Sequence, residues 1–137
     1  MKPEELSNIH SQHTDSRLDW NSYFLEIAFV VAKRSTCPRL QVGAVITHKN
    51  KIMTTGYNGA KTKEPHCIDI GCKIVDGHCE RVIHAEENAL IQLNQCGYPL
   101  KMYVTHEPCL ICARKARIHL IHDIIWKHPY RSQDGGN

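Results

Sequence analysis

The chain has 137 residues, of which 42% are hydrophobic and 23% charged, and its formal net charge is +3. This length is typical of one domain and this composition of a soluble globular protein, which excludes a disordered, collagen-like or two-domain architecture. No apolar run is long enough to cross a membrane and the first residues are polar, so we expect neither a membrane span nor a secretion signal and a cytoplasmic location. The basic residues are scattered, which argues against a nucleic-acid partner.

Cysteine and histidine are unusually frequent, with seven and ten copies. In the reducing cytosol, these residues at short spacings bind metal more often than cysteines form disulfides. A metal site is therefore the first function to look for.

The N-terminal part of the chain predicts a flexible arm followed by a helix. Residues 1–18 have no apolar periodicity, so the domain is expected to span residues 19–131. Asp19 can cap a helix that ends before Ser35. The apolar residues that recur at helical spacing are Trp20, Phe24, Ile27, Ala28 and Val31.

A β-hairpin and a long loop are expected next. The apolar runs 42–46 and 52–55 flank a polar turn at 48–51, which is typical of two antiparallel strands. Residues 57–80 then carry glycine, proline, cysteine and histidine with little periodicity. A loop of this length inside a compact domain is usually functional or held by a bound group.

The C-terminal half alternates helices with strands. The patterns predict a helix over 83–93, a strand over 102–105, a helix over 108–119 and a strand over 121–126. Strands that alternate with helices favour an α/β fold, with three α/β/α layers around a mixed sheet of four to five strands. Residues 132–137 are expected to be a flexible end.

Two short motifs place candidate metal ligands at the starts of the last two predicted helices. His84 opens one helix, whereas Cys109 and Cys112 open the next, with Pro108 expected in its first turn. Cysteines three apart share a helix face, and a helix N-terminus lowers the thiol pKa, so both sulfurs can reach one zinc ion. Three protein ligands leave a fourth position open, as in catalytic zinc sites. The alternative is a structural zinc knuckle, with His84 as a core histidine.

Glu86 indicates the chemistry of such a site. It lies two residues from His84 and can stand near the metal without binding it. There it could take a proton from water and deliver it to a substrate nitrogen. The pattern H-x-E followed by P-C-x-x-C is the known signature of zinc nucleoside and nucleobase deaminases.

Further segments surround these motifs. They are Trp20-x-x-Tyr23-Phe24, Arg34-Ser35-Thr36-Cys37, Val42-Gly43-Ala44-Val45, Thr55-Gly56-Tyr57-Asn58-Gly59, His84-Ala85-Glu86-Glu87-Asn88-Ala89 and Tyr103-Val104-Thr105. With them the chain resembles the deoxycytidylate (dCMP) deaminases over about residues 19–131. The resemblance implies the cytidine-deaminase-like fold and hydrolytic deamination of dCMP, or of a 5-modified dCMP, to dUMP for thymidylate synthesis.

The resemblance also implies roles for individual residues. Glu86 would pass protons to N3 and then to the leaving amine, and Asn58 would hold the nucleotide. Arg39 is the candidate for the 5′-phosphate, because guanidinium groups make bidentate phosphate contacts, with Ser35 or Thr36 adding hydroxyl donors. The alternative for Arg39 is a solvated surface charge.

A second, structural zinc ion is carried by similar dCMP deaminases. The matching positions here are Cys67, Cys72, His78 and Cys79. Four closed ligands would order the long loop, which packing alone does poorly. Because adjacent His78 and Cys79 are awkward joint ligands, His66 is the reserve, and reduced thiols packed as small apolar groups are the alternative.

Regulation and assembly are implied by the resemblance as well. Family members are typically hexamers, and many are activated by dCTP and inhibited by dTTP. Tyr130 and Arg131 follow the last predicted strand, where related sequences contact nucleotide, so they are candidates for effector and, for Tyr130, substrate binding; alternatively they only close the substrate pocket. The chain departs from the family at Lys61, often proline, and in ending at Asn137.

Two other functions share the zinc motifs. A nucleic-acid-editing deaminase acting on tRNA or single-stranded DNA would need a basic, aromatic groove, which a scattered net charge of +3 does not supply. A catalytically silent zinc module would not need Glu86. We therefore expect a small-molecule enzyme.

Overall fold

The computed structural model describes residues 16–60, 74–75, 78–79, 82–94 and 98–130, with backbone only for residues 60, 74, 75, 78, 79 and 82. The helices are α2 (Trp20–Ala32), α4 (Ala85–Ile91) and α5 (Leu110–Ile118). The main sheet consists of β1 (Gly43–His48), β2 (Lys51–Tyr57), β7 (Leu100–His106) and β8 (Ile121–His128). Short ladders pair β3 (Gly59–Ala60) with β6 (Val82–Ile83) and β4 (Ile74–Val75) with β5 (His78–Cys79).

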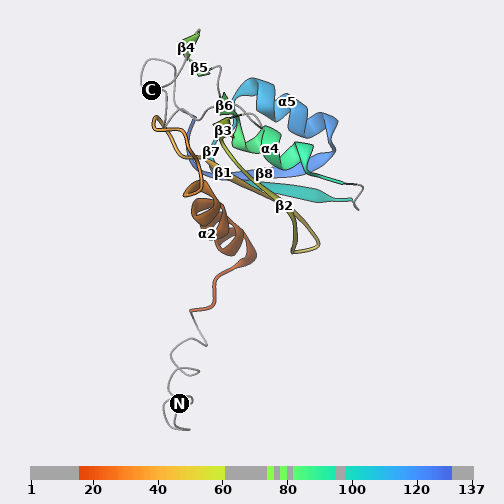
Figure 1. Ribbon diagram of the computed structural model, residues 1–137. Coiled ribbons are helices and arrows are strands. Elements are labelled where there is room, and N and C mark those ends of the chain that lie inside the picture. Colours follow the sequence, from red (N-terminus) through yellow and green to blue (C-terminus); the bar gives the residue numbers. More distant parts are fainter. Residues whose placement is uncertain (1–15, 61–73, 76–77, 80–81, 95–97, 131–137) are drawn as a thin grey trace.

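The main sheet is mixed, as the sequence predicts. Its strand order is β2-β1-β7-β8, with β1 antiparallel to both neighbours and β7 parallel to β8. Helix α2 covers one face of the sheet and helices α4 and α5 cover the other (Figure 1). This arrangement confirms the three-layer α/β/α architecture.

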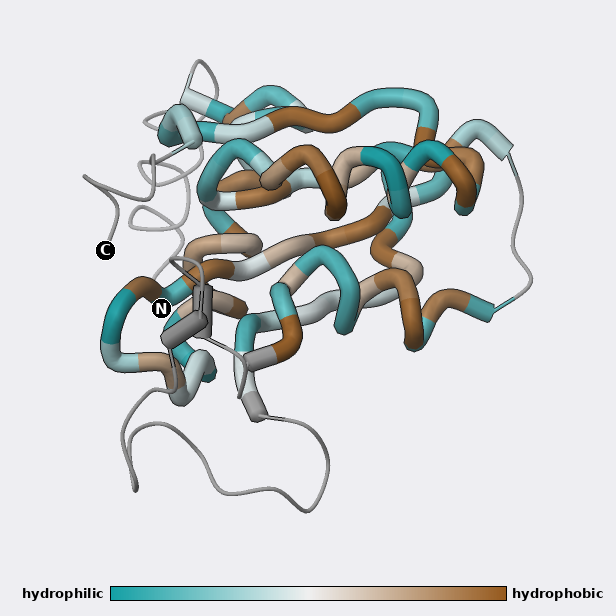
Figure 2. The backbone as a smooth tube through the Cα atoms, turned by 90° about the horizontal axis from the view of Figure 1, so that it is seen from above, coloured by the Kyte–Doolittle hydropathy of each residue, from teal (hydrophilic) through white to brown (hydrophobic). Residues whose placement is uncertain are grey.

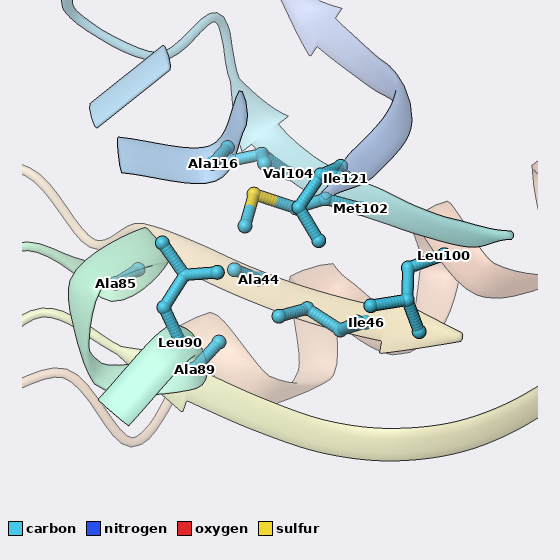
Figure 3. Close-up of a cluster of buried hydrophobic side chains, with 10 residues drawn as sticks. All are labelled: Ala44, Ile46, Ala85, Ala89, Leu90, Leu100, Met102, Val104, Ala116 and Ile121. Carbon is cyan, nitrogen blue, oxygen red and sulfur yellow. The ribbon is translucent and has the colours of Figure 1, made fainter. Parts of the chain in front are cut away.

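Strand alternation gives the sheet two apolar faces. On the α2 side, Val45 and Tyr103 pack with Phe24 and Ala28. On the other side, β1 and β7 residues meet α4 and α5, and Figure 3 shows these side chains pointing toward one another. This second cluster comprises Ala44, Ile46, Ala85, Ala89, Leu90, Leu100, Met102, Val104, Ala116 and Ile121. Hydrophobic stretches accordingly lie in the middle of the molecule between hydrophilic segments (Figure 2).

Helix α2 begins where the sequence predicts. Asp19 has an extended backbone and its carboxylate accepts a hydrogen bond of 2.7 Å from the amide of Ser22, which is a capping interaction. Phe24 and Ala28 are buried, but Trp20 is 55% exposed and stacks on Phe24. The expected apolar stripe is therefore correct except at its first residue, which lies in the first turn of the helix.

The hairpin is confirmed, and two of its glycines allow helices to approach closely. Lys49 and Asn50 both have positive φ, as a two-residue turn matched to the strand twist requires. A Cβ atom at Gly43 would lie 2.6 Å from the amide nitrogen of Ala32, and one at Gly56 would lie 2.5 Å from that of Ala89. Only glycine lets α2 and α4 pack this closely against β1 and β2.

The other boundaries differ in detail from the sequence pattern. Helix α4 ends at Ile91, and the segment interpreted as a loop contains the two-residue strands β3, β4 and β5. Such ladders are too short to produce a period in the sequence. Among the described helices, none is both long and apolar enough to cross a membrane. The proposed arm, C-terminal end and domain limits fall largely outside the described residues.

Candidate metal and active site

Two helix N-termini converge at the predicted metal site. His84 is the N-cap of α4 and Cys109 is the N-cap of α5, both with extended backbone. The Cys109 sulfur accepts a hydrogen bond of 3.5 Å from the Cys112 amide. Pro108 therefore precedes the helix and does not lie in its first turn as expected, because the thiol of Cys109 takes the capping role.

The three predicted ligands lie together. His84 Nδ1 is 3.2 Å from Cys112 Sγ and 3.8 Å from Cys109 Sγ, and the three ligand atoms all lie within 4.8 Å of one another. Tetrahedral zinc with ordinary bond lengths would separate nitrogen from sulfur by about 3.5 Å. The observed distances bracket this value, so the residues fit a zinc ion.

The protonation of these groups also fits a cation. A hydrogen bond from Cys112 and the contact with His84 lower the pKa of the Cys109 thiol to about 3, although burial acts in the opposite direction. The same sulfur–sulfur hydrogen bond raises the pKa of Cys112, and the contact with Cys109 raises the pKa of His84. Without a metal, Cys109 and Cys112 thus share one negative charge. A divalent cation would stabilise both thiolates.

Glu86 lies in the first turn of α4 and is only 5% exposed. Burial raises the pKa of its carboxyl group to about 7, although the helix N-terminal backbone and His84 act in the opposite direction. Desolvation outweighs these two stabilising effects on the carboxylate. A carboxyl group with this pKa can both accept and donate a proton near neutral pH, as general acid–base catalysis requires.

Two interactions hold the ligand-bearing helices. Asn88 Nδ2 donates a hydrogen bond of 2.8 Å to the carbonyl of Tyr57 at the end of β2. Lys115 on α5 lies 3.3 Å from the carboxylate of Glu87 on α4. Sequence reasoning missed the role of Asn88, although the residue belongs to a segment that carries the family resemblance.

The predicted substrate residues Ser35, Thr36, Arg39 and Asn58 lie on two neighbouring segments. Ser35 is buried, and its hydroxyl donates a hydrogen bond of 2.8 Å to the carbonyl of Asn58. In this arrangement its single hydroxyl proton is already used. Thr36 and Arg39 are half-buried, and the side chain of Asn58 is bonded to backbone groups on both sides of its amide.

Tyr130 follows β8 and is 44% exposed. Its amide donates a hydrogen bond of 2.9 Å to Glu107, whose own amide donates to the carbonyl of His128. Glu107, directly before Pro108, therefore connects the segment after β8 to the turn that precedes Cys109. Sequence analysis did not single out Glu107, because a lone glutamate in a turn gives no pattern.

The remaining predicted residues lie outside the described part of the chain or are described there by their backbone alone. Cys67, Cys72 and Arg131 lie outside the described residues, as does the reserve ligand His66. His78 and Cys79 form β5, but their side chains are not described. The second zinc site and the effector site stay predictions.

Comparisons with known proteins agree with this geometry. The family model of the cytidine and deoxycytidylate deaminase zinc-binding region matches residues 18–127. The chain is 40% identical to ComE operon protein 2 of Bacillus subtilis, over 85% of this chain and 63% of that protein. It is 36% identical to the deoxycytidylate deaminase of Mycobacterium phage D29, over 72% of this chain and 86% of that protein. The chain thus spans less than two thirds of the length of the Bacillus protein.

A solved structure shows the same fold. The dCMP deaminase of cyanophage S-TIM5, in complex with dCMP and dUMP, superposes with a TM-score of 0.70. The alignment covers 98% of this chain and 89% of that one at 24% sequence identity. The α/β/α layers described above are therefore those of a known deaminase structure.

Proposed function

Because the chain belongs to the zinc-binding family of cytidine and deoxycytidylate deaminases, we propose that it converts dCMP and water to dUMP and ammonia. The observation that carries this proposal is the buried carboxyl group of Glu86 beside the cluster of His84, Cys109 and Cys112. An acid–base group with a pKa of about 7 next to a zinc site suits hydrolysis of an exocyclic amine.

His84, Cys109 and Cys112 would hold the zinc ion through one nitrogen and two sulfur atoms. Zinc with three protein ligands lowers the pKa of a bound water to about 7 and so supplies hydroxide at neutral pH. Burial raises the pKa of Glu86 to about 7 in the metal-free protein. Its carboxyl group is therefore suited to exchange protons near neutral pH.

Glu86 moves the protons of the reaction. Its carboxylate takes a proton from the attacking water and delivers it to N3 of the cytosine, while the water oxygen bonds to C4. It then transfers the second proton of that oxygen to the amine, the C4–N bond breaks, and ammonia leaves. The product is dUMP, which can serve as a substrate for thymidylate synthesis. Glu86 returns to its starting protonation state.

Recognition of the nucleotide is assigned to the segments near the site. Arg39 binds the 5′-phosphate, with Thr36 as a hydroxyl donor, because a guanidinium group makes two parallel bonds to phosphate. Ser35 supports this segment through its bond to Asn58. Tyr130 lies on the segment that Glu107 connects to the turn before Cys109, and it closes the substrate pocket.

The finer properties are proposed on the resemblance alone. They are a second, structural zinc ion bound by Cys67, Cys72, His78 and Cys79, a cytoplasmic hexamer, and regulation by dCTP and dTTP through Tyr130 and Arg131. Metal analysis, the mass of the assembly, and dCMP saturation curves with each nucleotide test them separately.

The substrate is tested by offering the purified protein dCMP, deoxycytidine and a cytosine-bearing oligonucleotide in an absorbance assay. The proposal expects rapid turnover of dCMP, slower turnover of deoxycytidine and none of the oligonucleotide. Preferred turnover of the oligonucleotide would identify a nucleic-acid-editing enzyme. No turnover of any substrate by zinc-loaded protein would leave a zinc-binding module.

A further inference from the structure

We propose that Asn58 is a positioning residue, which holds the segment 35–42 so that Arg39 can meet the substrate phosphate. This inference rests on the proposed function for the role of Arg39. It gives Asn58 a task in addition to the direct nucleotide contact that the family resemblance implies.

The side-chain amide of Asn58 is engaged on both sides. Oδ1 accepts a hydrogen bond of 2.9 Å from the amide of Val42, and Nδ2 donates one of 2.7 Å to the carbonyl of Leu40. Because a backbone amide only donates and a carbonyl only accepts, these partners determine the orientation of the Asn58 amide. Asn58 is 7% exposed, so both bonds lie away from competing water.

The backbone of Asn58 holds the same segment. Its amide donates to the carbonyl of Val42 at 3.3 Å, and its carbonyl accepts from the hydroxyl of Ser35 at 2.8 Å. The Ser35 oxygen in turn accepts from the amide of Cys37 at 3.2 Å. Asn58 therefore forms hydrogen bonds near both ends of the segment, and Arg39 lies between these ends.

Tyr57, the residue before Asn58, connects these hydrogen bonds to the helix α4, which carries Glu86. Asn88 on α4, two residues after Glu86, donates to the carbonyl of Tyr57. The segment that carries Arg39 is thus linked through Asn58 and Tyr57 to the helix that carries the acid–base group. Such a link sets the distance between phosphate binding and proton transfer, which positional catalysis requires.

Only an amide satisfies this arrangement. The two backbone partners need one donor and one acceptor on the same short side chain, and asparagine supplies both. Aspartate would keep the acceptor for Val42 but would face the Leu40 carbonyl with a second oxygen. Alanine would leave both backbone groups unpaired.

Amide hydrogen exchange of the zinc-loaded full chain tests whether Asn58 holds the segment 35–42, without measuring activity. Asn58→Ala should speed exchange of the Val42 amide by about tenfold or more, with Asn58→Asp intermediate and the amides of β7 unchanged. The matched control is Gln92→Ala, since Gln92 is an exposed amide that donates to the Thr55 carbonyl on β2, the strand directly before Asn58. It should leave the 35–42 segment unchanged. Unchanged exchange at Val42 in folded Asn58→Ala protein would overturn the proposal.

Kinetics with dCMP and deoxycytidine test how Asn58 acts. Arg39→Ala should reduce the preference for dCMP, as a ratio of kcat/KM values, by about tenfold to a hundredfold. Asn58→Ala should reduce it by a similar factor, mainly through KM, and the double variant should lose little more. Equal losses on both substrates, which leave the preference for dCMP unchanged, would show that Asn58 contacts only the base or sugar and would overturn the proposal. An unchanged preference in Arg39→Ala would instead refute the phosphate role of Arg39, while the exchange result still decides whether Asn58 holds the segment.

Discussion

Glu86 should make the metal-free protein less stable as pH rises, and Glu86→Gln should remove this effect. Burial raises the pKa of the carboxyl group from 4.5 to about 7. The native state therefore binds the proton more tightly than the unfolded chain, so its contribution to stability is complete below pH 4.5 and is lost as pH rises through 7. A shift of about 2.5 units corresponds to about 3 kcal/mol of unfolding free energy.

The assay is urea unfolding of chelated parent and Glu86→Gln protein between pH 4 and 8. Groups common to both proteins cancel in the difference between the two curves. The variant should gain about 3 kcal/mol relative to the parent across this range. Parallel curves would refute the reasoning, because they would mean that Glu86 titrates in the folded state as it does in the unfolded chain.

Three further variants test the fold and the second metal site. Gly43→Ala should lower the unfolding free energy by about 1–3 kcal/mol in urea titrations, since the new methyl group meets the α2 backbone at Ala32; an unchanged midpoint would contradict the close approach. Asp19→Ala should lower the urea midpoint at neutral pH and have no effect in strong acid, because the hydrogen bond to Ser22 lowers the pKa of Asp19 and its stabilising charge is lost as pH falls through that value. Cys79→Ser should reduce the zinc content measured by atomic absorption from two ions per chain toward one and lower the melting temperature; a single ion in the parent would exclude the second site.

The fold could be predicted where local signals agree with packing. The Asp19 cap, the hairpin turn and the alternation of helices with strands each have a local cause, and all three are present in the structure. The position of Pro108 was wrong, because Cys109 is not an ordinary capping residue and caps α5 only through its sulfur. Trp20 follows the helical period but lies in the first turn, where periodicity alone does not determine burial.

The metal site could be predicted because its ligands lie close in sequence to helix starts. The spacing of His84, Cys109 and Cys112 requires only that two helix N-termini meet, which they do. The supporting contacts could not be predicted in the same way. Asn58 accepts a hydrogen bond from the backbone amide of Val42, 16 residues away. Glu107 accepts one from the backbone amide of Tyr130, 23 residues away. Backbone partners leave no residue-type signal in a single sequence.

The central claim, that Glu86 transfers the protons in a zinc-dependent deamination, is tested most directly by measuring zinc content and dCMP turnover together in Glu86→Gln. Glutamine keeps the shape of the side chain but cannot accept a proton from water. The account predicts that the variant binds zinc at His84, Cys109 and Cys112 as the parent does while its turnover is lost by a factor of at least about 100. Turnover within a few fold of the parent, at equal zinc content, would contradict it.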